Sequence, residues 1–107
     1  MIGLGKWKAE LVSKYVNGEV NFSIADKDGQ YDIDIDLPNP FKAVKIKILE
    51  IVEVGDNGLN GKAKVAMKPL PTMDIDASFT FDGDTVEGLL DFGKMGRVKV
   101  VNGQRIG

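Results

Sequence analysis

Acidic side chains are the main candidates for chemistry in this chain, and they gather in residues 26–36, DKDGQYDIDID. Aspartates that alternate around a glycine are typical of calcium-binding loops. An EF-hand loop that started at Asp26 would require glycine at position six and glutamate at position twelve, where this chain has Tyr31 and Leu37. We therefore predict no metal site, and expect residues 26–29 to form a four-residue hairpin loop in which Gly29 adopts positive φ.

Three aspartates, Asp32, Asp34 and Asp36, share one face of the stretch that follows. Neighbouring carboxylates can act as general acid and base. Lys45 and Lys47, however, have the parity to share that face from the next apolar stretch, and such cross-strand pairs are common on solvated surfaces. No two carboxylates can be placed together in an interior, so we do not expect an enzyme.

A second charged face consists of lysines, which we interpret as a solvated surface. The alternative interpretation is a docking surface for an acidic partner. No aromatic side chains interleave with these lysines, and the net charge is only −2, so nucleic acid is not an expected partner. The members of this face are Lys45, Lys47, Lys62, Lys64 and Lys68.

The composition excludes several other kinds of chemistry. The 107 residues contain no cysteine and no histidine, so disulfides, Cys/His zinc sites, His-ligated haem and Ser-His-Asp triads are impossible within this chain. No apolar run approaches the roughly 20 residues that span a bilayer, and the start lacks the features of a signal peptide. We expect one cytoplasmic domain, residues 1–107, with no membrane association and no cofactor.

Apolar and polar residues alternate along most of the chain, which indicates β-strands. Turn signals and prolines divide the alternation into eight expected strands: 7–15, 20–24, 31–37, 41–54, 59–68, 73–81, 86–92 and 97–106.

The turns also predict which residues face one another. A two-residue turn at Asn17-Gly18 would place Tyr15 opposite Val20 and Leu11 opposite Ile24. By the same rule, a turn at Asp82-Gly83 would place Ile75 opposite Leu90, Ala77 opposite Gly88 and Phe79 opposite Val86, and the loop at 26–29 would place Ile24 opposite Tyr31. The apolar faces coincide in each hairpin.

Because every connection is short, consecutive strands should be antiparallel neighbours in an eight-stranded up-and-down meander. Closing this meander into a barrel would remove its two exposed edges. The expected fold is therefore an all-β barrel, with a β-sandwich as the alternative architecture.

Two motifs at the ends of the chain resemble those of the lipocalin and calycin families. Gly5-Lys6-Trp7 opens the first strand, and Arg105 lies near the end of the last. The resemblance implies that Trp7 packs under Arg105 and closes one end of a barrel, as a cation over an indole face. Fatty-acid-binding relatives use paired interior arginines, and haem-binding relatives use a histidine, so the resemblance identifies no specific ligand.

Small residues are expected at one level inside this barrel. The predicted registers place Glu50 opposite Ala63, Ala63 opposite Ala77, and Ala77 opposite Gly88. This row would leave room for a ligand, which Glu50 would orient. Alternatively, a β-bulge near Leu49 would turn Glu50 outward and bring Leu49 and Ile51 inside, and the sequence does not decide between the two.

Our main functional hypothesis is a barrel that binds a small, mostly apolar molecule in a cavity of at least a few hundred Å³. The expected lining is Trp7, Phe22, Tyr31, Ile33, Glu50, Ala63, Ile75, Ala77, Phe79, Gly88 and Leu90. The alternative hypothesis is a ligand-free structural or interaction module that self-associates through exposed leucines, namely Leu59, Leu70 and Leu89.

Overall fold

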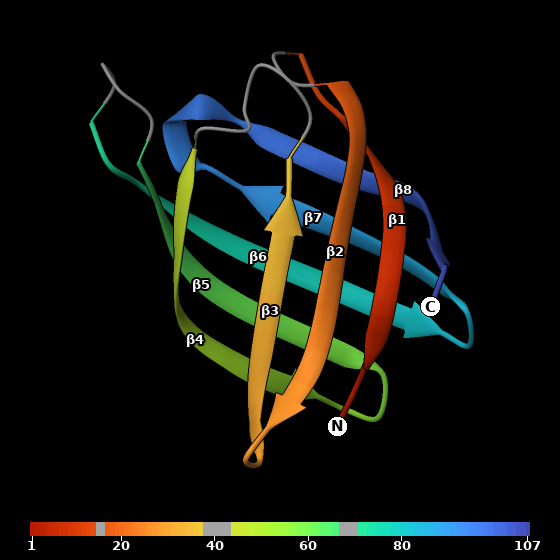
Figure 1. Ribbon diagram of the computed structural model, residues 1–107. Coiled ribbons are helices and arrows are strands. Elements are labelled where there is room, and N and C mark those ends of the chain that lie inside the picture. Colours follow the sequence, from red (N-terminus) through yellow and green to blue (C-terminus); the bar gives the residue numbers. More distant parts are fainter. Residues whose placement is uncertain (15–16, 38–43, 67–70) are drawn as a thin grey trace.

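A computed structural model describes residues 1–14, 17–37, 44–66 and 71–107, and it contains all eight expected strands (Figure 1). The strands are β1 (Gly5–Val12), β2 (Asn17–Lys27), β3 (Gln30–Asp36), β4 (Lys45–Val54), β5 (Gly58–Ala66), β6 (Met73–Asp82), β7 (Thr85–Asp91) and β8 (Arg97–Arg105). A short 3-10 helix, η2 (Gly93–Met95), connects β7 to β8. None of the helical structure in these ranges is long and apolar enough to cross a membrane.

All eight strands form one antiparallel sheet in the order β3-β2-β1-β8-β7-β6-β5-β4. The first and last strands of the chain pair with each other, so the sheet curls into a nearly closed barrel (Figure 1). The sheet edges are β3 and β4, although these strands follow one another in the sequence. The up-and-down barrel is therefore the correct architecture, and the β-sandwich alternative is not adopted.

The predicted hairpin registers are wrong in detail, because the turns lie elsewhere. Asn17 and Gly18 belong to β2, where Gly18 pairs with Leu11. The Asn17 side chain donates a hydrogen bond to the carbonyl of Ser13 at 3.0 Å. This bond joins the start of β2 to the residue that follows β1. The predicted contact of Tyr15 with Val20 lies outside the described residues, as do the strand ends predicted within 38–43 and 67–70.

The second and third hairpins differ from the prediction by smaller shifts. The β2–β3 turn is Asp28-Gly29, with φ of 55° and 83°, and it is tighter than the expected four-residue loop. The carboxylate of Asp26 accepts a hydrogen bond from the Gly29 N–H at 2.9 Å, which gives this side chain a structural role in the turn.

The β6–β7 turn is Gly83-Asp84, since Asp82 pairs with Thr85. Ala77 consequently faces Leu90, and Phe79 faces Gly88. All of these registers differ from the predicted ones by an even number of positions, so each side chain keeps its predicted face.

The core consists of two clusters inside the barrel. One contains Trp7, which is fully buried, together with Ile24, Leu59, Phe81 and Val86. The other contains Ala9, Leu11, Val20, Val98 and Val100. Phe22 and Phe79 pack against both clusters, and their ring centroids lie 6.0 Å apart.

Candidate functional site

A cavity of about 140 Å³ lies inside the barrel. Almost all the atoms that line it are apolar, and no polar or charged side chain among the described residues is buried. Its lining comprises Leu11, Val20, Phe22, Ile24, Ile33, Ile35, Leu37, Ile46, Ile48, Ile51, Leu59, Asn60, Gly61, Lys62, Ala63, Ile75, Ala77, Phe79, Phe81, Leu90 and Val100.

Seven of the predicted lining residues surround this cavity: Phe22, Ile33, Ala63, Ile75, Ala77, Phe79 and Leu90. The four others lie elsewhere. Trp7 is buried in the core cluster at one end of the barrel, and Tyr31 makes polar contacts at that same end. Gly88 and Glu50 are displaced for reasons of register, described next.

Glu50 lies on the outer face of the barrel, where it is exposed and faces Lys62 on β5. The cause is a β-bulge: the register of β4 against β5 shifts between Ile48 and Glu50, which adds Leu49 to β4. The role proposed for Glu50 inside the barrel is therefore wrong, and the bulge alternative is the structure. Ile51 does turn inward, as that alternative required, whereas Leu49 is exposed.

The expected row of small residues is rearranged by the same register differences. Gly61, which was not predicted to be important, pairs with Ala77, and Ala63 pairs with Ile75. Gly88 instead provides space for a ring, since a Cβ on this residue would lie 2.5 Å from the Phe79 side chain. The small residues beside the cavity are therefore Gly61, Ala63 and Ala77.

The lining that the sequence did not predict includes four residues of β3 and β4, namely Ile35, Ile46, Ile48 and Ile51. Three of them, Ile35, Ile46 and Ile48, alternate with charged residues along the sequence, which is the pattern of an inward face. They matter because these two strands are the unpaired edges of the sheet.

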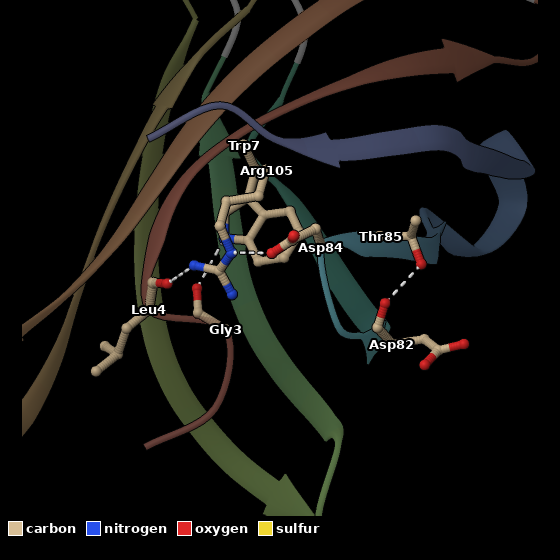
Figure 2. A network of polar contacts seen from close by, with 7 residues as sticks. All are labelled: Gly3, Leu4, Trp7, Asp82, Asp84, Thr85 and Arg105. Atoms are coloured by element: carbon tan, nitrogen blue, oxygen red, sulfur yellow. Dashed lines mark hydrogen bonds and ion pairs between the residues drawn. The ribbon is translucent and has the colours of Figure 1, made fainter.

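Arg105 lies over the Trp7 ring at one end of the barrel, the contact that the resemblance implied, and Figure 2 shows the two side chains with their polar partners. The guanidinium carbon lies 4.4 Å from the centroid of the Trp7 ring. Arg105 also donates hydrogen bonds to the Leu4 carbonyl and to the Asp84 carboxylate, the latter at 2.9 Å. The indole N–H donates to the Gly3 carbonyl at 2.8 Å, so the chain before β1 is tied to both side chains.

Gly5 is required by this closure. Its φ is 131°, and a Cβ there would lie 2.4 Å from an Arg105 guanidinium nitrogen. The Gly-x-Trp pattern thus has a local cause, which is the close approach of the arginine to the backbone before the tryptophan.

Tyr31 joins the two edge strands at the same end of the barrel. Its hydroxyl donates a hydrogen bond to the carboxylate of Glu53 on β4 and accepts one from the Ile2 N–H at 2.8 Å. Partial burial raises the pKa of Tyr31 above its usual value of about 10, and the hydrogen bond to Glu53 and the charge of Glu53 raise this pKa further. The Ile2 N–H acts in the opposite direction.

We expect Tyr31 to ionise at higher pH in the folded protein than in the unfolded chain. Its contribution to stability is then present below about pH 10 and is lost as the pH rises through the folded-state pKa. The tyrosinate absorbance of the wild type minus that of Tyr31→Phe isolates this residue, because the chain has only two tyrosines. A folded-state midpoint equal to or below the midpoint measured in urea would contradict the structure, and Glu53→Gln should lower the folded midpoint.

Away from this contact, the opening between β3 and β4 leaves a groove of about 130 Å³, which we call the seam. It is lined by Ile33, Asp34, Ile35, Val44, Ile46 and Ile48, four of which also line the interior cavity. Ile35 and Ile48 are 37% and 36% exposed although they point inward. The cavity therefore reaches the surface along the seam.

Among the described residues, no three acidic side chains gather in a way that could hold a metal ion, and the cavity wall holds no carboxylate. The leucines proposed for self-association are placed differently from expectation: Leu59 is buried, Leu89 is half-buried and Leu70 lies outside the described residues.

The fold and the site define an all-β protein: a nearly closed, eight-stranded antiparallel barrel with an apolar cavity that opens between two edge strands. Comparisons of the chain with protein-family models, with curated proteins and with solved structures find no match.

Proposed function

We propose that this protein is a lipocalin-like barrel that binds a small apolar molecule in its interior. The observation that carries the proposal is the cavity of about 140 Å³ with an almost wholly apolar wall. Apolar pockets in otherwise close-packed cores are the usual sites of small-molecule binding. The stacking of Arg105 on Trp7 supports the comparison with lipocalins, because it reproduces the way in which that family is expected to close one barrel end.

The size of the cavity limits the ligand. It is smaller than the few hundred Å³ expected from the sequence, and it is close to the roughly 150 Å³ apolar cavity that accepts benzene or xenon in another protein. The proposed ligand is therefore either a compact molecule of about the size of benzene or the apolar end of a longer one that projects through the seam.

Benzene is a suitable probe for this proposal, and its binding can be followed by NMR of the isoleucine and leucine methyl groups. We expect shifts in methyl groups that line the cavity, such as those of Ile75 and Leu90, and none in Ile106, which is exposed at the chain end.

The variant Ala77→Leu should fill the cavity, abolish these shifts and stabilise the protein by about 0.5–2 kcal/mol. Ala25→Leu is the matched control, because Ala25 is exposed on β2 and the same substitution there leaves the cavity unchanged. An absence of methyl shifts in the wild type, together with a destabilised Ala77→Leu variant, would show that the interior is filled.

A further inference from the structure

The two edge strands that border the seam have every feature of a β-ladder except the pairing itself. They are consecutive in the chain and, because seven antiparallel pairings separate them around the sheet, they run in opposite directions. Within the residues that the structure describes, no ladder joins them, and the hydrogen bond from Tyr31 to Glu53 spans the opening.

A register in which Asp36 lies opposite Lys45 matches both faces of these strands and stays close to the existing Tyr31–Glu53 contact. If Asp36 lies opposite Lys45, then Asp34 lies opposite Lys47 on the outer face. On the inner face, the same register places Ile35 opposite Ile46 and Ile33 opposite Ile48. A shift by one residue would put aspartates against isoleucines, and a shift by two that pairs Asp36 with Lys47 would leave a single opposite-charge pair. The opposite shift by two would keep two such pairs, Asp34 with Lys45 and Asp32 with Lys47, but it would move Tyr31 two positions further from Glu53, to which Tyr31 is hydrogen-bonded.

The four charged residues that this register pairs, Asp34, Asp36, Lys45 and Lys47, form no ion pair within the described part of the chain in the open arrangement. The ion pairs found among the described residues join Lys8 to Glu19, Lys64 to Asp74, Arg97 to Asp91 and Arg105 to Asp84. None of them uses Asp34, Asp36, Lys45 or Lys47. Pairing would therefore add two opposite-charge contacts and cover the exposed sides of Ile35 and Ile48, while competing with no existing ion pair.

We propose that the seam is the entrance to the cavity and that it closes by forming this missing ladder between β3 and β4. The Tyr31–Glu53 hydrogen bond holds one end of the opening, so closure requires the strands to approach only along the remainder of their length. The closed form shields the cavity, and the open form admits the ligand. The entrance role rests on the proposed function, whereas the ladder does not.

The ladder is tested by cross-linking, which the absence of natural cysteine makes unambiguous. The pair Asp34→Cys and Lys47→Cys lies directly opposite in the proposed register, within the roughly 7 Å between Cα atoms that a disulfide requires. The control pair Asp32→Cys and Lys45→Cys is displaced by four residues, which is about 13 Å along a strand. All four positions are exposed, so neither pair should disturb folding.

Under mild oxidation at low protein concentration, we expect the first pair to form an intramolecular disulfide at least tenfold faster than the control pair. Similar rates for both pairs would overturn the proposed register, and failure of both pairs would overturn closure. Equal thermal midpoints of the two reduced variants would show that the comparison is fair.

The entrance is tested on the cross-linked first pair with benzene as the probe. We expect the exchange rate of benzene to fall at least tenfold on oxidation and to recover fully when a reductant is added. Unchanged exchange would place the entrance elsewhere and overturn that part of the proposal. If benzene fails to bind even the reduced protein, the proposed function and the entrance fall together, while the cross-linking rates still decide whether the ladder forms.

Discussion

Replacement of Trp7 by alanine should cost about 3–5 kcal/mol of folding free energy, the range measured for large aromatic residues in cores. The indole is fully buried, stacks on Phe22 at 6.5 Å and meets Phe81 edge-on at 5.0 Å between ring centroids. Its removal also deprives Arg105 of the ring beneath its guanidinium. Since domains of this size are stable by only about 5–15 kcal/mol, the variant should lie close to unfolding.

Urea denaturation followed by circular dichroism measures this loss. Trp7→Phe should cost clearly less, because it keeps an aromatic ring against Phe81 and loses mainly the hydrogen bond to Gly3. Val12→Ala, at an exposed position of the same strand, should cost less than about 1 kcal/mol. A cost for Trp7→Ala as small as that of Val12→Ala would mean that the barrel end is not packed as described.

The second large effect is expected from a single added methyl group. Gly103 is buried on β8, and a Cβ there would lie 2.4 Å from both the backbone oxygen and a side-chain carbon of Val86. A backbone oxygen cannot rotate away as a side chain can, so Gly103→Ala must separate β7 from β8 at the Val86–Gly103 pair. We expect a loss of about 2–3 kcal/mol.

Gly61→Ala is the matched control, because it makes the same substitution in another strand without positive φ. The nearest atom to its new Cβ would be the backbone oxygen of Glu50 at 3.5 Å, which is an ordinary contact. The methyl group would lie beside the cavity. We expect it to be neutral or to stabilise by up to about 1 kcal/mol. Thermal midpoints of both variants suffice for the comparison, and similar losses at the two positions would contradict the strand packing.

The sequence predicted strands and faces well because both depend on alternation, which arises where one face of a strand is buried and the other is solvated. It predicted registers poorly because a register depends on which residues turn. Asn17-Gly18 has the composition of a hairpin turn, yet it continues β2, and the pairing of β1 with β2 moves by six positions as a result. An even displacement leaves every apolar face intact, so alternation alone cannot detect the error.

The candidate site shows the same limit from another side. Seven lining residues could be named from their faces, but Glu50 could not be placed, because one added residue at Leu49 reverses the face of everything after it. The unpaired seam was also beyond prediction. Asp34 and Lys47 have the parity of partners, and only the curvature of the whole sheet decides whether two such strands meet.

The pairing of β1 with β8 has a consequence for how the protein folds. The hydrogen bond between Glu10 and Asn102 joins residues 92 positions apart, and the whole β1–β8 ladder has similarly distant partners. Loops of that length must close before this ladder contributes any stability, so folding should take milliseconds to seconds rather than microseconds. On the ribosome, the hairpin of β1 and β2 forms before β8 has been synthesised. The free edge of β1 therefore has no partner until β8 emerges. A nascent chain that stalls before β8 would therefore present an unpaired β1 edge in addition to the edge that β3 already leaves open on the other side of β2.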